Sequence, residues 1–114
     1  ASGAWASGAL AMNAADLATF AHALMDGRLF QNDETLDTMT NFVSTGQDRG
    51  FTGYGLGLAQ LRDGAWGHAG GTPGFGSNLV FDPVREMVVV FLGNSGSFNV
   101  NPMELASLAD AAGK

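Results

Sequence analysis

Apolar side chains recur at helical spacing in the first part of the chain. Asn13 can cap a helix, and the inward positions then follow one helical face: Leu17, Phe20, Ala21, Leu24 and Met25. Gly27 is placed to end this helix. A shorter helix is expected after Asn32, where two acidic residues favour a helix N-terminus, and its inward residues are Leu36 and Met39.

From Tyr54 the spacing of the apolar residues changes to two. Tyr54, Leu56 and Leu58 alternate with three glycines, which predicts a strand with one bulky face and one bare face. Residues 62–64 are Arg-Asp-Gly and predict a hairpin turn into a second strand over residues 65–69.

Two further strands and a helix are expected in the remainder of the chain. The glycine-rich residues 70–76 predict a loop, and residues 77–81 a third strand that ends at Asp82-Pro83. A fourth strand is expected over residues 86–92. Its apolar run shows no alternation, which predicts a central strand buried on both faces. The sequence Asn101-Pro102-Met103-Glu104 then predicts the start of a C-terminal helix that extends to about residue 112.

The order of these elements defines the fold class. Helices followed by an antiparallel β-meander and a C-terminal helix are typical of an α+β fold. Residues 1–12 and 42–50 are expected to be irregular, because small and polar residues dominate them. Side chains expected to serve packing are Trp5, Trp66, Met25, Met39 and Met87. No internal repeat or low-complexity linker divides the 114 residues.

Charge and composition exclude several classes of partner. The chain has 11 Asp and Glu against 5 Lys and Arg, a net charge of −6, and its arginines are scattered, so a nucleic-acid partner is not expected. The longest apolar run, residues 87–92, is too short to span a bilayer. No charged-then-apolar signal segment opens these residues, and localisation is left open because an export signal would lie upstream of them.

Several kinds of catalytic or cofactor site fail on the residues that they need. The absence of cysteine removes disulfides, thiolate zinc sites and cysteine nucleophiles. The dinucleotide, phosphate-loop and nucleophile-elbow patterns all lack residues that they require. Two histidines 46 positions apart, His22 and His68, do not make a metal site, so neither a metal nor a cofactor is predicted.

The residues with the strongest functional pattern surround His68. Glycine makes up 17 of the 114 residues, about twice the usual share of ~7%. The stretch Trp66-Gly67-His68-Ala69-Gly70-Gly71-Thr72-Pro73-Gly74-Phe75 concentrates several of them at the end of a predicted strand. Taken alone, His68 fits a structural histidine and the glycines fit turn residues. A histidine between glycines, next to a strand with a bare face, favours a binding site instead.

This stretch resembles the third motif of the serine β-lactamase, D-alanyl-D-alanine carboxypeptidase and esterase family, in the form His-x-Gly. Three further segments match the pattern of the C-terminal part of that family in order. They are the small-residue lead-in of residues 7–12 before Asp16-Leu17, the segment Tyr54-Gly55-Leu56-Gly57-Leu58, and Phe81-Asp82-Pro83 followed by residues 88–94. The resemblance implies part of a β-lactamase/transpeptidase-like fold over residues 1–114, as a single partial domain.

The resemblance also implies roles for individual residues. His68 would contribute a hydrogen bond or a positive field near the serine nucleophile, and the Gly71 N–H would be one of the two oxyanion-hole donors. Gly70 would keep the strand bare for the substrate, and Thr72 and Asn94 would line the pocket. Tyr54 is expected to be a core or rim residue, because the catalytic tyrosine of the family belongs to a separate motif.

Two elements of the family pattern are missing from these residues. The nucleophile motif Ser-x-x-Lys is absent, because the only lysine is Lys114 and residue 111 is alanine. The second motif, Tyr-x-Asn or Ser-x-Asn, is absent upstream of His68, and Ser97-Phe98-Asn99 lies on the wrong side of it. We therefore expect a C-terminal fragment of a serine hydrolase that is inactive alone.

Other interpretations and partners follow from this expectation. The alternative is an independent non-catalytic binding or structural module of the same fold. The substrate implied for the parent enzyme is a small ester, a β-lactam or a D-alanyl peptide. An N-terminal fragment could restore activity by complementation. The apolar strand over residues 86–92 is expected to present an open edge, because the strands that pair with it in the family are missing, and this edge predicts self-association.

Overall fold

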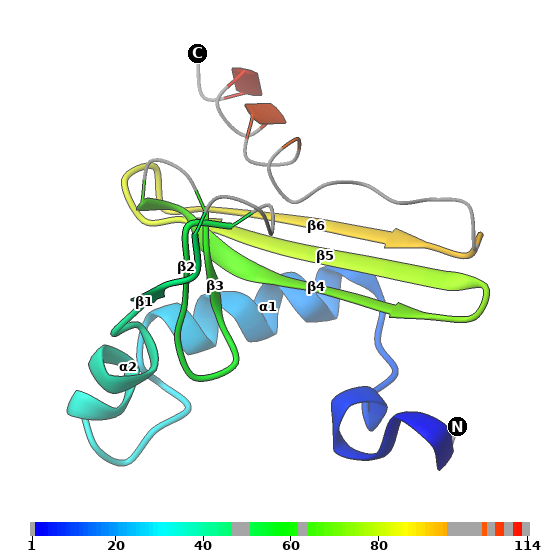
Figure 1. Cartoon of the computed structure of the whole chain (residues 1–114), viewed down its shortest axis with the longest axis horizontal. Helices are drawn as coiled ribbons and strands as arrows, with labels where there is room; N and C mark the ends of the chain where they lie inside the picture. The colour runs from blue at the N-terminus through cyan, green and yellow to red at the C-terminus, as the bar shows by residue number, and fades with distance from the viewer. Residues whose placement is uncertain are drawn as a thin grey trace.

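The structure is a computed structural model that describes residues 2–46, 51–61 and 64–95, with 104, 107, 108, 111 and 112 in the C-terminal segment. Its elements in chain order are η1 (Ser2–Gly8), α1 (Ala14–Met25), α2 (Glu34–Met39), β1 (Val43–Ser44), β2 (Gly53–Tyr54), β3 (Ala59–Gln60), β4 (Trp66–Thr72), β5 (Phe75–Asp82) and β6 (Met87–Gly93). The expected α+β class is confirmed (Figure 1). Among the described C-terminal residues, all five are helical, whereas Asn101-Pro102-Met103 lies outside the described part.

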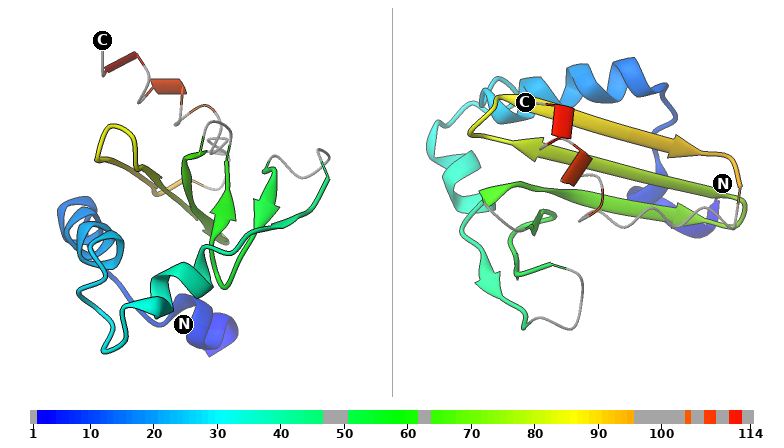
Figure 2. Two further views of the ribbon diagram at one scale, coloured as in Figure 1. Left: turned by 90° about the vertical axis from the view of Figure 1, so that its left-hand side faces the viewer. Right: turned by 90° about the horizontal axis from the view of Figure 1, so that it is seen from above.

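The strands form one antiparallel meander. Their order in the six-stranded sheet is the order of the sequence, β1 to β6. The three long strands are paired along their length, so that Trp66 of β4 lies beside Phe81 of β5, which lies beside Val88 of β6. The three short strands have two residues each, and β3 pairs with β4 only at Trp66 and Gly67. The two halves of the sheet therefore differ in length (Figure 2).

Helix α1 forms where the sequence predicts it. The side chain of Asn13 accepts a hydrogen bond of 2.9 Å from the Asp16 N–H, and Gly27 follows the helix with a φ of +69°. Ala21 and Leu24 are buried, whereas Phe20 is 40% exposed and was wrongly expected to face inward. The helix lies along one face of the sheet, where it contacts β6 and β5 (Figure 2).

Helix α2 is also confirmed. The Asn32 side chain accepts a 2.8 Å hydrogen bond from the Glu34 N–H, and Leu36 and Met39 pack against the buried core. Residues 42–50 were expected to be a loop, but Val43 and Ser44 form β1, and residues 47–50 lie outside the described part. Among the described helices, none combines the length and the hydropathy needed to cross a bilayer.

The hydrophobic core has two parts, one on each face of the sheet. On the face covered by α1, Leu24, Leu58, Trp66 and Phe81 are buried together, and the Trp66 and Phe81 rings meet edge to face with centroids 5.3 Å apart. Met25 and Met39 pack on this cluster, and Met87 is half-buried. On the other face, a second cluster holds Leu61, Ala65 and Val80, with Phe51, Val89 and Phe91 against it.

The predicted strand over residues 54–58 is wrong. Tyr54 ends β2, Leu56 is 62% exposed, and the chain reverses at Gly57, where φ is +77°. A hydrogen bond of 2.8 Å from the Gly55 N–H to the Leu58 carbonyl closes this turn. These glycines therefore lie in a tight hairpin and not on the bare face of a strand. The prediction was wrong because alternation of apolar residues with glycine is compatible with both structures.

The predicted loop over residues 70–76 is also wrong. Strand β4 continues to Thr72 and β5 begins at Phe75, so that the turn consists of Pro73 and Gly74 alone. Gly74 has a φ of +86°, a conformation that a Pro-Gly turn accommodates at its second position. Arg62 and Asp63, in the other predicted turn, lie outside the described residues, and Gly64 beside them has a φ of +83°.

The position of β6 differs from the expectation of a central strand. Within the described part of the chain it is an edge strand of the sheet. Both of its faces do carry packed residues, since Val88 contacts the cluster on the α1 face and Val89 and Phe91 contact the opposite cluster. The uninterrupted apolar run therefore reflects a strand with two partly buried faces and not a central place.

The N-terminal segment contains another correction. Residues 2–8 form two short 3₁₀ turns separated by a kink at Trp5, where φ is +44°, whereas residues 9–12 are irregular as expected. Trp5 is 84% exposed, so the expectation that it serves packing is wrong, whereas Trp66 is buried as expected.

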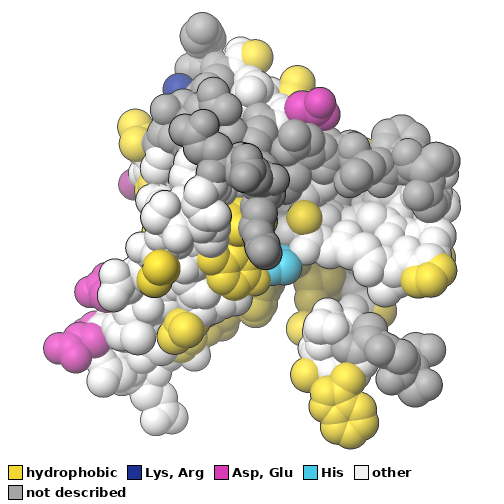
Figure 3. All heavy atoms as spheres, viewed as in Figure 1, with side chains coloured by type: hydrophobic (Ala, Val, Ile, Leu, Met, Phe, Trp, Pro, Cys, Tyr) yellow, Lys and Arg dark blue, Asp and Glu magenta, His cyan; other side chains and the backbone are white. Residues whose placement is uncertain are grey.

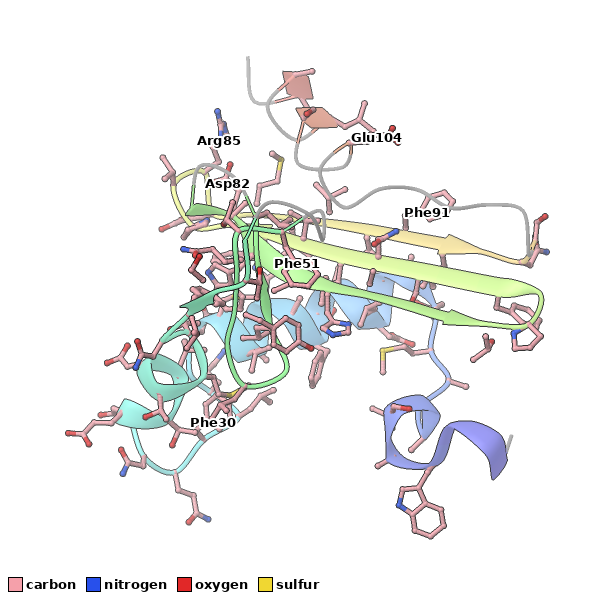
Figure 4. The ribbon with its side chains drawn as sticks, viewed as in Figure 1. Phe30, Phe51, Asp82, Arg85, Phe91 and Glu104 are labelled. Atoms are coloured by element: carbon pink, nitrogen blue, oxygen red, sulfur yellow. The ribbon has the colours of Figure 1, made fainter. Side chains whose placement is uncertain are left out.

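The turn from β5 to β6 is stabilised by one buried carboxylate. Asp82 Oδ1 accepts hydrogen bonds from the N–H groups of Val84 (2.9 Å) and Arg85 (3.1 Å), and Oδ2 pairs with the Arg85 guanidinium. Burial by itself raises the pKa of Asp82, but its hydrogen bonds to Arg85 and Val84, together with the Arg85 charge, lower this pKa overall. Figure 4 shows the pair at the end of the sheet where β5 turns into β6.

Candidate functional site

His68 is the third residue of β4 and its side chain is exposed. Side chains alternate between the two faces of a strand, so His68 lies on the same face as Trp66, which packs toward α1. The cross-strand neighbour of His68 is Leu79 of β5. Because α1 contacts β6 and β5, this part of β4 lies beyond the cover of the helix and the imidazole is accessible.

The imidazole of His68 has a specific hydrogen-bond partner. The Tyr54 hydroxyl lies 2.7 Å from His68 Nε2, and the two rings meet nearly edge-on, at 72°, with centroids 5.9 Å apart. Tyr54 is half-buried at the end of β2, which agrees with its expected place at the rim. Its contact with His68 was not predicted, since no sequence pattern links two residues 14 positions apart on non-adjacent strands.

Strand β4 has a free edge next to His68. Strand β3 pairs with it only at Trp66 and Gly67, so that among the described residues no strand covers β4 from His68 to Thr72 on that side. Leu61 N–H donates to the Ala65 carbonyl over 2.8 Å, which fixes the alternation of the β3–β4 ladder. In this ladder the N–H groups of alternate β4 residues point toward β3, so Gly67 is bonded to β3. The N–H groups of Ala69 and Gly71 point to the same side, which is open because β3 does not extend that far.

The glycines of β4 have different packing requirements. A Cβ on Gly67 would overlap the Leu79 backbone and would lie 3.0 Å from Val80 Cα. A Cβ on Gly70 would lie 2.7 Å from Ser77 Oγ, whereas one on Gly71 would meet nothing nearer than the Phe75 carbonyl oxygen at 3.9 Å. Gly67 is thus required by close strand packing, and Gly71 lies at an open position.

The predicted site residues are only partly brought together. His68, Gly70, Gly71 and Thr72 all lie along one strand and are exposed. Asn94 follows β6, next to Gly93, which pairs through Gly76 of β5 with Gly71. It therefore lies two strands away, at a distance of roughly 10 Å for a strand spacing of about 4.8 Å. The structure thus separates Asn94 from the edge that carries His68.

The surroundings of this edge are apolar. Within the described part of the chain, no group of three or more His, Asp or Glu side chains is placed to hold a metal ion. Phe51 lies with its ring centroid 5.6 Å from that of Tyr54 and occupies the middle of the view in Figure 4. Figure 3 shows apolar side chains gathered in the middle of this face and acidic side chains at its margin.

The arrangement provides hydrogen-bond donors on an open strand edge. The outward N–H of Gly71 is a fixed donor, and the His68 ring supplies a second polar group on the same strand. An extended substrate could add to this edge as a further strand. A nucleophile is not evident in the arrangement, and the motif Ser-x-x-Lys does not occur in the 114 residues.

Comparison with known proteins gives matches of two kinds. A protein-family model described as Beta-lactamase matches residues 1–114. Among solved structures, a D-stereospecific amidohydrolase from Streptomyces sp. is similar, with 30% sequence identity and a TM-score of 0.66. The match covers 88% of this chain and 30% of that enzyme, so the chain spans about a third of its length. Comparison with curated protein sequences gives no match.

Proposed function

Because the chain belongs to the β-lactamase family, we propose that it forms the third-motif part of a serine hydrolase active site, inactive by itself. The observation that carries this proposal is the free edge of β4, where His68 and the outward N–H of Gly71 lie on one strand. The similar amidohydrolase is about three times longer, which leaves room for a nucleophile segment outside these residues.

The chemistry proposed for this edge is acyl transfer. A serine oxygen from another segment, which gives its proton to a base of that segment, attacks the substrate carbonyl, and the C=O electron pair moves onto the oxygen as an oxyanion. Collapse of this tetrahedral intermediate expels the protonated alcohol or amine and leaves an acyl-enzyme, which water hydrolyses to the free acid. The Gly71 N–H would donate to that oxyanion, a contribution typically worth about 10²–10³ in turnover. His68 would donate a hydrogen bond to a substrate oxygen, and Gly70 would let the substrate approach β4 closely.

The substrate class proposed is a small molecule with an acyl group: an ester, a β-lactam or a D-alanyl peptide. The solved relative is named a D-stereospecific amidohydrolase, which favours amides of D-configured residues within this set. Thr72, at the end of β4, is proposed to contact the substrate. Asn94 is proposed to contact only a substrate that extends across the glycines at 71, 76 and 93.

The test uses the entire reading frame that contains this chain. Its product is expected to hydrolyse a chromogenic ester, a chromogenic cephalosporin or a D-alanyl anilide, and the 114-residue chain alone is expected to give no turnover. The variant His68→Ala should lower kcat/KM by about 10²-fold, a loss of the size seen when a transition-state donor is removed. His22→Ala changes the other histidine, exposed on α1, and is the matched control.

Two results would overturn the proposal. A start codon immediately before Ala1 would show that no nucleophile segment precedes the chain and would favour the independent non-catalytic module. Equal activity of His68→Ala and His22→Ala in the long product would show that the β4 edge does not take part. Activity restored by mixing the chain with a separate N-terminal fragment would support the proposal.

A further inference from the structure

The hydrogen bond between Tyr54 and His68 joins two segments that the family motifs do not connect. Tyr54 is the only tyrosine of the chain and lies on β2, two strands away from β4. Its hydroxyl is 2.7 Å from Nε2. Among the described residues this is the one side-chain hydrogen bond made by the His68 ring, and it engages Nε2.

The backbone on both sides of Tyr54 lies close to neighbouring segments, most closely at Gly55. A Cβ on Gly53 would lie 2.9 Å from Gln60 Oε1 and 3.1 Å from Phe42 Cβ. A Cβ on Gly55 would overlap the Met39 carbonyl oxygen at the end of α2. The two glycines therefore let the segment lie directly against its neighbours, which holds the Tyr54 backbone in place.

The ring of Tyr54 is supported as well. Phe51 packs against it at a centroid distance of 5.6 Å, and Phe51 itself contacts the buried cluster of Leu61, Ala65 and Val80. The hydroxyl is thus held by a continuous set of contacts that begins in the core. Because packing already fixes the Tyr54 side chain, its hydroxyl can orient a hydrogen-bond partner without losing rotamer freedom during the reaction.

From these contacts we infer that Tyr54 is a positioning residue that holds neutral His68 in the Nδ1–H tautomer. A phenol hydroxyl donates readily to an unprotonated imidazole nitrogen, and the hydrogen bond at one ring nitrogen determines which nitrogen carries the proton. With Nε2 as the acceptor from Tyr54, the proton lies on Nδ1. That N–H is then the group that His68 presents to a substrate oxygen on the open side of the ring.

This inference rests on the proposed function in one respect, the presence of a substrate oxygen at the β4 edge. It predicts that His68 acts as a neutral hydrogen-bond donor and not as a base. Substrates that offer a carbonyl or carboxylate oxygen at this point would therefore be favoured over those that offer only a hydrogen-bond donor.

The first test does not depend on activity. Nitrogen-15 NMR of the histidine rings at about pH 9, where free imidazole side chains are neutral, distinguishes protonated from unprotonated ring nitrogens. In the unsubstituted chain we expect His68 to show protonated Nδ1 and unprotonated Nε2. In Tyr54→Phe this preference should be lost, while the signals of His22 remain unchanged. Protonated Nε2 in the unsubstituted chain overturns the inference even if the variant fails to fold.

The second test is a double-mutant cycle in the product of the whole reading frame. Tyr54→Phe should lower kcat/KM by about 3- to 10-fold, the effect of one neutral hydrogen bond. In the background His68→Ala the same substitution should have no further effect, because a positioning residue acts through its partner. Additive losses would overturn the inference. A long product in which His68→Ala changes nothing would instead refute the proposed function, while the NMR result would still test the Tyr54–His68 contact.

Discussion

The close approach of β4 and β5 at Gly67 predicts a large loss of stability on Gly67→Ala. The added methyl carbon would lie 2.8 Å from the Leu79 carbonyl carbon and 3.0 Å from Val80 Cα, against about 3.5 Å for a relaxed carbon–carbon contact. Both atoms belong to the backbone, so the strands must separate by at least about 0.5–0.7 Å. Ladder hydrogen bonds of ~2.9 Å would then exceed the length at which they are effective.

The expected cost follows from this displacement. Overpacking typically costs about 1–3 kcal/mol, and each buried backbone group left without its partner adds about 1–3 kcal/mol. We expect a decrease of about 3–5 kcal/mol in the free energy of unfolding, a large part of the roughly 6–17 kcal/mol usual for 114 residues. The melting temperature should fall by about 12–20 °C.

The assay is urea unfolding monitored by the fluorescence of Trp66, which is buried against Phe81, whereas Trp5 is already exposed. Gly71→Ala is the matched control, because its methyl group would meet nothing nearer than 3.9 Å. It should change stability by less than about 0.5 kcal/mol, as most unstrained surface substitutions do. If the two variants unfolded within about 1 kcal/mol of each other, the argument from strand packing would be refuted.

Three further predictions concern other parts of the sheet. Gly70→Ala brings a methyl group to 2.7 Å from Ser77 Oγ, so it should be destabilising by about 1 kcal/mol, and Ser77→Ala in the same chain should restore most of the loss in urea unfolding. Asp82→Asn should lower the free energy of unfolding by about 1–2 kcal/mol at pH 7. The pKa of Asp82 is lower in the folded than in the unfolded state. The stability that its carboxylate contributes is therefore present above the unfolded-state pKa and is lost as the pH falls through the folded-state pKa. Urea unfolding of both proteins from pH 7 to pH 3 should therefore show a shrinking difference, and a difference that stays constant would contradict the role of the charge. The edge of β6 should promote self-association that rises with concentration in light scattering, and Leu92→Lys, at a side chain 41% exposed, should reduce it; a monomer at high concentration for both would contradict the prediction.

The elements with a side-chain signal of their own could be predicted from the sequence. Asn13 and Gly27 mark the ends of α1 through capping and a positive φ, and the structure contains both features. The strand over residues 77–81 was predicted to end at Asp82-Pro83, because an Asp-Pro pair is a local turn signal, and β5 does end at Asp82. The fold class then followed from the order of such elements.

The positions that depended on glycine were predicted poorly. Glycine has no side chain, so alternation with it carries no information on whether the backbone extends or turns. The hairpin at Gly57 and the continuation of β4 through Gly70 and Gly71 are decided by pairing with distant segments. The exposure of Phe20 and Trp5 depends in the same way on which surfaces the sheet offers to the N-terminal segment.

The residues of the candidate site could be identified from the sequence, but the strand that carries Gly70, Gly71 and Thr72 and the contacts around it could not be predicted. The resemblance to a known family directed attention to His68 and Gly71, and the structure places them on one exposed strand. The contact with Tyr54 requires the hairpin and the one intervening strand, β3, to be placed correctly, and single-sequence patterns do not encode that placement. Asn94 was expected in the same pocket, but it follows β6, which is two strands away from β4 in the sheet.

Because the short strands of the sheet pair with only part of β4, the amides of β4 fall into two sets, one bonded within the sheet and one on the open edge. The first set serves as an internal control when ligand binding to the second set is measured. Beyond Gly67 the amides of His68 and Gly70 bond to β5, while those of Ala69 and Gly71 face the open side. Hydrogen exchange along this strand should therefore alternate between slow and fast positions. A ligand that adds to the edge would slow only the fast positions, whereas a change in global stability would alter the slow ones as well.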